Sequence, residues 1–278
     1  MNKIKGRNIV KMTLIYVLLL SASALLMIPF VWLISASLKL DRDVFTIPIQ
    51  WLPRNPVWTN YIDIWTRIPL LTFLRNTVRL TVIITTMQLI TSSFAAYAFS
   101  KLRFAGRNIL FLAYIATIAI PWQVYMVPQF IMFRTMDLVN THMAMIILQS
   151  FSAFGVFLMK QFYDTIPDEL IEAARIDGMT EQKIWMRIML PLAKPALATL
   201  TIFTFVFVWN DFLGPRLYLT TQSLWNIQIG MRMFIGQYAS EFGLIMAIAT
   251  VSLIPILIVF LALQRFFVQG IATSGLKG

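Results

Sequence analysis

Long apolar segments constrain this chain more than any other feature. Six of them approach the roughly 20 apolar residues that a helix needs to cross a bilayer. They lie at about 12–37, 76–99, 108–132, 143–162, 196–213 and 243–266. Of the 278 residues, 59% are hydrophobic and only 13% are charged, which is about half the charged share of a typical soluble domain. The pattern predicts an all-α integral membrane protein, with a single transmembrane domain over residues 1–278 that contains six transmembrane helices.

The basic residues predict how this domain is oriented. Short loops rich in Lys and Arg stay on the cytoplasmic side of a membrane. With the N-terminus inside, that side collects Lys3, Lys5, Arg7, Lys11, Lys101, Arg103, Arg107, Lys160, Arg175, Lys183, Arg187, Lys194, Arg265 and Lys277. We therefore expect both termini and residues 163–194 to be cytoplasmic. The segment 12–37 exceeds the apolar core of a signal peptide and is expected to be a retained first span. The net charge of +11 does not indicate nucleic-acid binding, because the basic residues mark the ends of apolar segments and form no patch interleaved with aromatic residues.

The charged stretch between the fourth and fifth apolar segments, residues 164–194, predicts a first short helix. Pro167 can take the first helical position, where its missing N–H costs nothing, and Asp168 and Glu169 suit the positive end of the helix dipole. Gly178 tolerates positive φ and is expected to end this helix in a sharp turn.

A second short helix is expected to follow directly. Thr180 is a candidate N-cap, the helix should run through Leu190, and Pro191 should stop it. Two short helices that meet at an angle on the surface of a membrane protein form a shape suited to docking into another protein.

The residues of this stretch also follow a spaced pattern. It reads Glu-Ala-Ala, three residues, Gly, nine residues and Ile-x-Leu-Pro. The residues that carry it are Glu172, Ala173, Ala174, Gly178, Ile188, Leu190 and Pro191, and Asp177 directly precedes the glycine. The pattern resembles the cytoplasmic EAA loop of ABC-importer permease subunits. A bare Glu-Ala-Ala triplet would carry no information, whereas the whole spacing between membrane spans is specific.

Further segments resemble permeases of the maltose type, which transport carbohydrates. These are Trp209-Asn210-Asp211-Phe212, Leu52-Pro53 followed by Asn60-Tyr61, and the ending from Gln264 to Gly270 and from Gly275 to Gly278. The resemblance thus runs over nearly the whole chain.

The resemblance implies a set of functions and partners. The loop 163–194 would form a helix-turn-helix that couples to an ATPase through Glu172, Ala173, Ala174, Asp177, Gly178, Ile188, Leu190 and Pro191. The chain would pair with a second permease in a heterodimer, with two ATPase subunits and with an extracytoplasmic solute-binding protein, in a bacterial or archaeal cell (inner) membrane. The carbohydrate would be a sugar or oligosaccharide, and a permease for another small polar solute is the alternative.

The sequence offers few residues for catalysis. It has no Cys and a single His, His142, for which an interfacial polar role is the simpler interpretation than a metal ligand. It contains no Gly-x-x-x-x-Gly-Lys-Ser/Thr motif to hold ATP phosphates. We expect no cofactor or metal on this chain, with ATP and magnesium bound by the separate ATPase.

Polar residues within the apolar segments are candidates for a substrate path, since sugars are held by amides and hydroxyls. They are Gln123, Gln149, Ser150, Asn210 and Asp211. Gln123 follows a helix break at Pro121 that either lines a cavity or is satisfied by neighbouring helices. Asp211 is either a functional carboxylate or a boundary residue solvated at the interface. Ser92 and Ser93 suit close helix packing.

Two other classes of membrane protein are compatible with the composition alone. A membrane-embedded transferase would need acids or histidines converging on a site, and the spans lack them. A channel or ion-coupled carrier would call for inverted repeats or ionisable groups at mid-membrane, and neither is evident. The EAA spacing favours the importer permease.

Overall fold

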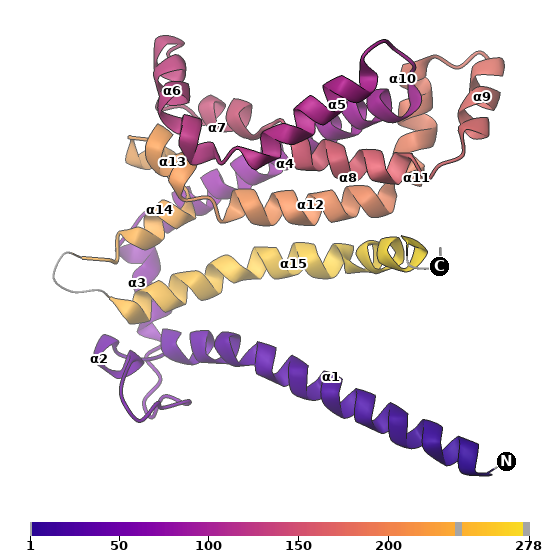
Figure 1. The fold of residues 1–278 in the computed structure, drawn as a ribbon. Helices are drawn as coiled ribbons and strands as arrows, with labels where there is room; N and C mark the ends of the chain where they lie inside the picture. The colour runs from indigo at the N-terminus through magenta and orange to yellow at the C-terminus, as the bar shows by residue number, and fades with distance from the viewer. Residues whose placement is uncertain (1, 237–240, 275–278) are drawn as a thin grey trace. The chain divides into compact units, whose positions relative to one another are not determined.

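The computed structural model describes residues 2–236 and 241–274, and their side chains over 11–236 and 241–266. The tail residues 275–278 that contribute to the resemblance lie outside this range. The described residues form helices joined by loops (Figure 1), as an all-α membrane protein should. The chain divides into two compact units, residues 1–68 with 231–252 and residues 69–230 with 253–278, and each is described by itself. That 1–278 acts as a single domain stays a prediction.

Apart from the last two residues of α14 (Ile227–Arg232), the described part of the first unit contains three helices and the start of a fourth. They are α1 (Asn2–Ser37), α2 (Asp41–Val44), α3 (Thr59–Thr66) and the beginning of α15 (Phe242–Ser274). The amide of Asn60 on α3 donates to the carbonyls of Ser37 (2.9 Å) and Lys39 (3.0 Å) at the end of α1. The backbone N–H of Gly243 donates to Asp41 at 2.8 Å. These side chains hold the end of α1 and the start of α15 to the short helices between them.

The second unit is organised around α4 (Leu70–Lys101). α8 (Ala153–Tyr163) and α12 (Lys194–Trp209) pack along it (Figure 1). The packing is close because small residues face each other: a Cβ added at Gly155 would lie 2.4 Å from the Oγ of Ser92. This contact supports the prediction that Ser92 serves helix packing.

Among the residues that the structure describes, three helices are long and apolar enough to cross a membrane: Lys11–Ser37, Leu70–Lys101 and Phe242–Phe266. Three bent pairs also qualify if each counts as one span. They are Arg107–Ala119 with Trp122–Thr135 (bent by 100°), His142–Gln149 with Ala153–Tyr163 (41°), and Glu181–Leu192 with Lys194–Trp209 (80°). The described residues therefore hold up to six spans.

The expected span over 108–132 is broken into two helices. The structure has α5 (Arg107–Ala116), a 3-10 turn η1 (Thr117–Ala119) and α6 (Trp122–Thr135). The expected break at Pro121 is present, because proline lacks the N–H that would continue the helix.

The expected span over 143–162 is likewise not one continuous helix, since α7 (His142–Gln149) ends before α8 begins. α4 supplies the reason. The side chains of Gln88 and Thr91 donate to the backbone carbonyls of Gln149 and Ser150, both at 2.7 Å. The Oγ of Ser152 then caps the new helix by accepting from the N–H of Gly155 at 3.0 Å. A break inside a membrane is tolerated when neighbouring helices satisfy the freed backbone groups in this way.

The fifth predicted span, 196–213, ends four residues too late, because α12 stops at Trp209. A carboxylate oxygen of Asp211 accepts the N–H of Gly214 at 3.1 Å, which turns the chain into α13 (Leu213–Tyr218). The short η3 (Gln222–Leu224) and α14 (Ile227–Arg232) follow.

Candidate functional site

The EAA loop begins with α9 (Asp168–Ile176), which divides into two faces. Ile171 and Ala174 are buried, whereas Glu172, Ala173 and Ile176 are exposed. Pro167 was predicted at the first helical position but lies one residue before the helix, with ψ 137°. Its backbone is extended there, so the helix starts at the residue whose carboxylate suits the dipole.

Gly178 ends α9 as predicted. Its φ is +75°, its N–H donates to the carbonyl of Arg175 at 3.0 Å, and the N–H of Met179 donates to that of Ala174 at 3.0 Å. A Cβ placed at Gly178 would have no atom within 4 Å. The glycine is therefore required by backbone conformation and not by lack of space.

The second helix of the loop differs from the prediction. Thr180 does precede α10 (Glu181–Ile184), but its side chain makes no capping hydrogen bond. Pro191 does not stop the helix: a π-helical turn η2 (Trp185–Met189) follows α10, and α11 (Leu190–Leu192) continues through the proline. In a regular α-helix, the ring of Pro191 would clash with the carbonyl four residues earlier. In the wider π turn, the N–H of Leu190 donates to the carbonyl of Trp185. The added residue shifts the carbonyls before Pro191 and avoids the clash.

A buried hydroxyl on α4 fastens the loop to the spans. The Oγ of Ser93 accepts from the indole N–H of Trp185 at 2.8 Å and lies 2.7 Å from the hydroxyl of Tyr163 on α8. One turn further along α4, the hydroxyl of Tyr97 donates to Glu181. The α4 helix thus holds α8 and the second helix of the loop through two side chains on one face.

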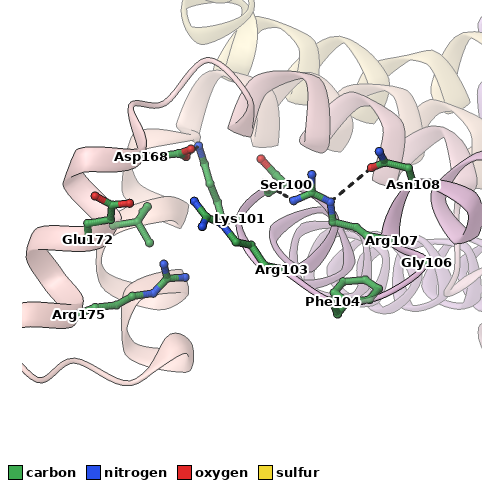
Figure 2. Close-up of a pocket in the computed structure, with 11 residues that line it drawn as sticks. Ser100, Lys101, Arg103, Phe104, Gly106, Arg107, Asn108, Asp168, Glu172 and Arg175 are labelled. Atoms are coloured by element: carbon green, nitrogen blue, oxygen red, sulfur yellow. Dashed lines mark hydrogen bonds and ion pairs between the residues drawn. The ribbon is translucent and has the colours of Figure 1, made fainter.

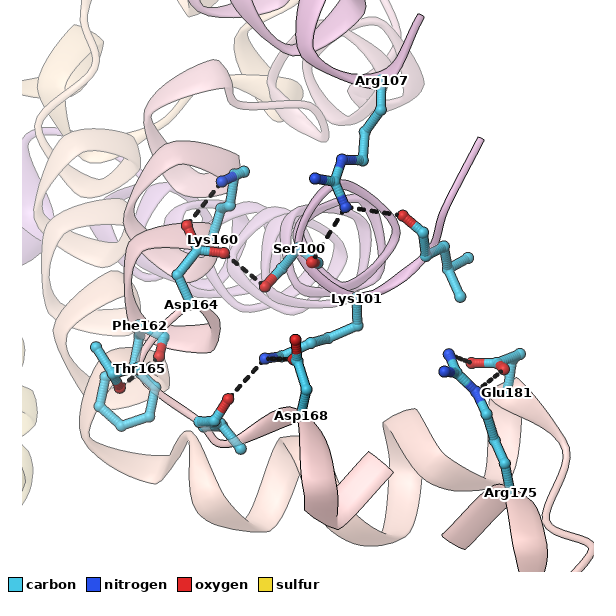
Figure 3. Close-up of polar contacts among 12 residues, drawn as sticks. Ser100, Lys101, Arg107, Lys160, Phe162, Asp164, Thr165, Asp168, Arg175 and Glu181 are labelled. Carbon is cyan, nitrogen blue, oxygen red and sulfur yellow. Dashed lines mark hydrogen bonds and ion pairs between the residues drawn. The ribbon is translucent and has the colours of Figure 1, made fainter. Parts of the chain in front are cut away.

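Glu181 also binds within the loop itself. It accepts from Arg175 of α9 at 2.7 Å (Figure 3). Because the same carboxylate accepts from Tyr97, one side chain joins α9, α10 and α4. This contact fixes the angle between the two short helices.

A second set of polar contacts joins the end of α4 to the start of α9 (Figure 3). The ammonium of Lys101 donates to the carbonyl of Ile166 at 2.6 Å and to Asp168 at 2.5 Å. The hydroxyl of Ser100 donates to Asp164 at 2.7 Å, and Lys160 pairs with the other oxygen of that carboxylate at 2.7 Å. The hydrogen bond from Lys101 holds the pKa of Asp168 below its usual value.

The predicted coupling residues separate into exposed and packed groups. Glu172, Ala173, Asp177, Gly178 and Pro191 are exposed, Ala174 is buried, and Ile188 and Leu190 are half-buried.

The sequence analysis missed three anchor residues, whose side chains on α4 attach the loop to the spans. Ser93, Tyr97 and Lys101 recur at every fourth residue of α4, and this spacing, which places side chains on one helix face, is the signal that could have found them.

The predicted substrate-path residues meet only in part. The amide of Gln149 donates to Asp211 at 2.6 Å, and Asn226 donates to the backbone carbonyl of Asp211 at 2.7 Å. The Oε1 of Gln149 is buried without a hydrogen-bond partner among the described residues. A cavity of about 10 Å³ borders this cluster, which is close to the room that one water needs.

The other three candidates do not join this pair. Ser150 donates to the carbonyl of Ile146 in its own helix at 2.5 Å. Asn210 is exposed, donates to Val206 at 2.9 Å and accepts from Gln228 at 3.3 Å. Gln123 is exposed and makes no hydrogen bond within the described side chains.

His142 has a structural partner. Its Nε2 lies 2.9 Å from the carbonyl of Leu224, which agrees with the interfacial polar role. Within the ranges that the structure describes, no three His, Cys, Asp or Glu side chains gather closely enough to hold a metal ion.

Comparison with known proteins decides the family. Residues 88–273 match the family described as "Binding-protein-dependent transport system inner membrane component". The chain belongs to this family. It is therefore a multi-pass inner-membrane component of a binding-protein-dependent transport system, a permease and not a catalytic subunit, and such systems pair permeases with ATPase and solute-binding proteins.

Three comparisons illustrate the breadth of the family. The chain is 33% identical over 253 residues to the arabinooligosaccharides transport system permease protein AraQ of Halalkalibacterium halodurans, covering 90% of this chain and 91% of that one. It is 32% identical over 253 residues to the sn-glycerol-3-phosphate transport system permease protein UgpE of Pectobacterium atrosepticum, with coverages of 88% and 90%. The crystal structure of a bacterial ABC transporter involved in the import of the acidic polysaccharide alginate contains a similar chain, with a TM-score of 0.80 and 26% sequence identity. The match covers 92% of this chain and 96% of that chain.

Proposed function

We propose that this permease forms half of the translocation pathway of an ATP-driven importer for a sugar or oligosaccharide, delivered by an extracytoplasmic solute-binding protein. The arabinooligosaccharide permease and the alginate importer support this substrate class, as does the melibiose/raffinose/stachyose import permease protein MelC of Bacillus subtilis, which is 33% identical over 255 residues. The second half of the pathway would come from a different permease in a heterodimer.

The proposal rests on the fact that one side of the EAA loop is attached to α4 while the other side is exposed. Its inner side is tied to α4 by Ser93, Tyr97 and Lys101. Its outer side presents Glu172 and Ile176, and 86% of the Ile176 surface is exposed. An apolar side chain kept at this exposure in a charged loop suits insertion into a partner. We assign that partner as the ATPase, with residues 163–194 and both termini in the cytoplasm, where the basic turns belong.

The anchors give the coupling a physical route. Movement of the ATPase would displace α9, and the contacts of Glu181 and Lys101 would carry that displacement to the end of α4. Because α4 is also the packing partner of α8 and α12, a rigid shift of its end would change the spacing of the helices that border the path.

For the substrate path we propose the cluster of Gln149, Asp211 and Asn226. Its amide and carboxylate groups can hydrogen-bond sugar hydroxyls, and the Oε1 of Gln149, buried here beside room for about one water, would accept one when the path opens. Such a sparse site suits a low-affinity pathway in which the binding protein supplies the selectivity.

The alternative is transport of another small polar solute, and the likeness to UgpE favours it. Uptake into proteoliposomes that hold the complete transporter distinguishes the two, with a labelled trisaccharide and labelled glycerol 3-phosphate offered in turn with their binding proteins. Trisaccharide uptake supports the sugar assignment, and uptake of glycerol 3-phosphate alone overturns it.

The same preparation tests the docking face. Ile176→Ala should reduce co-purification of the ATPase and slow uptake, because the side chain contributes little to the fold of its own chain. Ile109→Ala, which removes an apolar side chain of similar exposure (74%) from α5, is the matched control. Full ATPase binding and uptake by Ile176→Ala would remove α9 from the docking surface.

A further inference from the structure

A basic cavity of about 540 Å³ lies beside the EAA loop. One wall is the turn between α4 and α5, and the other is the side of α9 (Figure 2). Its volume is within the range of about 300–1,000 Å³ that small-molecule sites occupy. The charged residues that line it are Lys101, Arg103, Arg107, Asp168, Glu172 and Arg175.

The charges of these residues do not cancel. Lys101 is paired with Asp168, and Arg175 is paired with Glu181. Arg107 donates to the carbonyls of Ser100 (3.4 Å) and Leu102 (3.0 Å), contacts that position its guanidinium without neutralising it.

Arg103 makes no hydrogen bond or ion pair with another of the described side chains. Figure 2 shows its guanidinium pointing across the cavity toward α9, from which Arg175 points back. Arg103 and Arg107 together outweigh Glu172, the one lining carboxylate that is not paired with a cation, so the cavity keeps a positive excess.

The cavity also lies at the boundary between the spans and the aqueous phase. The candidate span on α4 ends at Lys101, and the next candidate begins at Arg107. The turn between them carries Phe104, which lines the cavity and is 42% exposed. Aromatic side chains favour the headgroup layer of a membrane, and basic pockets between transmembrane helices bind anionic lipid headgroups.

We propose that this cavity binds the phosphate group of an anionic phospholipid, with Arg103 and Arg107 as the donors and Phe104 against the glycerol backbone. Guanidinium groups suit phosphate because their N–H groups form paired hydrogen bonds to its oxygens. The bound headgroup lies between the end of α4 and α9, so it stabilises the attachment of the EAA loop to α4. This inference goes beyond transport itself and makes coupling dependent on lipid composition.

Photocrosslinking of the complete transporter in nanodiscs tests the proposal. Phe104 is replaced by p-benzoylphenylalanine, and adducts are identified by mass spectrometry in discs that contain a limiting fraction of phosphatidylglycerol in phosphatidylcholine. We expect the phosphatidylglycerol adduct to dominate. The double variant Arg103→Gln/Arg107→Gln should reduce it about tenfold or more, since each cation near a membrane surface contributes substantially to the binding of anionic lipid. The control Arg134→Gln/Arg216→Gln removes the same charge from exposed positions outside the cavity and should leave the adduct unchanged.

A second arm separates lipid from free phosphate. Inorganic phosphate is added at millimolar concentration to discs with phosphatidylglycerol, and little loss of the adduct supports a lipid ligand. Complete displacement by phosphate would overturn the lipid assignment, as would equal adducts with both lipids or insensitivity to the double variant. An adduct with the ATPase subunit in place of lipid would identify the cavity as a protein contact and would also overturn it.

Discussion

Replacing Ser93 by Ala should loosen the EAA loop, whereas the same change at the neighbouring Ser92 should not. Both side chains are fully buried on α4. The Oγ of Ser93 binds Tyr163 and Trp185, while the Oγ of Ser92 has no hydrogen-bond partner among the described residues. The two variants remove the same atom from adjacent positions, and only Ser93→Ala breaks hydrogen bonds to other helices.

The magnitude follows from the groups left behind. Tyr163 is fully buried, and a buried polar group without a partner costs about 1–3 kcal/mol. Trp185 is half-buried, so its lost bond adds about 0.6 kcal/mol, the average for side-chain bonds between membrane helices. We expect Ser93→Ala to destabilise the attachment of the loop by about 2–3 kcal/mol and Ser92→Ala to change it by less than about 0.5 kcal/mol.

Hydrogen–deuterium exchange of the assembled transporter in nanodiscs measures this difference directly. A loss of 2–3 kcal/mol in local opening corresponds to about 30- to 150-fold faster exchange, and it should appear in peptides from residues 163–194. Tyr163→Phe combined with Ser93→Ala should cost less than the sum of the single changes, because both remove the same bond. Equal exchange in Ser92→Ala and Ser93→Ala would refute the anchoring role.

Three further predictions concern single positions. Gly178→Val should lower transport and leave the spans inserted, because a side chain in the left-handed region costs about 1–2 kcal/mol. Gly178→Asn should retain more transport, because asparagine tolerates that region, and normal uptake by Gly178→Val would contradict the prediction. The pKa of Asp168 is depressed by Lys101, so the pair stabilises the fold above the usual carboxyl pKa and its contribution is lost as the pH falls through the lowered value. The melting-temperature difference between the natural protein and Asp168→Asn should therefore narrow as the pH is lowered below the usual carboxyl pKa, and a constant difference would count against the pair. Gly155→Ala should destabilise the packing of α8 on α4. Adding Ser92→Ala should recover part of that lost stability, because the closest atom to the new methyl group is the Oγ of Ser92 at 2.4 Å. If the shifts in melting temperature of the two single variants simply add in the double variant, this contact is not the cause.

The helical content and the first turn of the EAA loop were predictable because their causes are local. Apolar length identifies a span, and glycine permits the positive φ at Gly178 whatever surrounds it. The break at Ser150 was not predictable in this way. Ser152 offers a local cap for the second helix, but the break also depends on Gln88 and Thr91, which belong to another helix.

In the candidate sites too, some features were predictable from local sequence and others depend on tertiary contacts. Gln149 and Asp211 each stand out by their polarity in an apolar segment, and the structure adds that they bind each other across 62 positions of sequence. Tyr97 stands out less, because its four-residue spacing from Ser93 and Lys101 acquires a meaning only when its partner, Glu181, is known. The motif predicts the part of the loop that faces a partner, while the fastening to α4 depends on tertiary contacts.

The π turn at Trp185–Met189 has a consequence for the genetics of this loop. A π turn holds one residue more than an α turn, so a single-codon deletion within 185–189 would leave a regular α turn and keep the flanking segments in nearly the same direction. The same deletion would return the proline to a regular helix, where its ring clashes with the carbonyl four residues earlier. A one-codon insertion has no spare turn to occupy, and it would form a second bulge or rotate the first short helix by about 100° relative to the spans. Length changes here are therefore asymmetric: a deletion disturbs the hydrogen bonding around the proline, and an insertion disturbs the orientation of the loop.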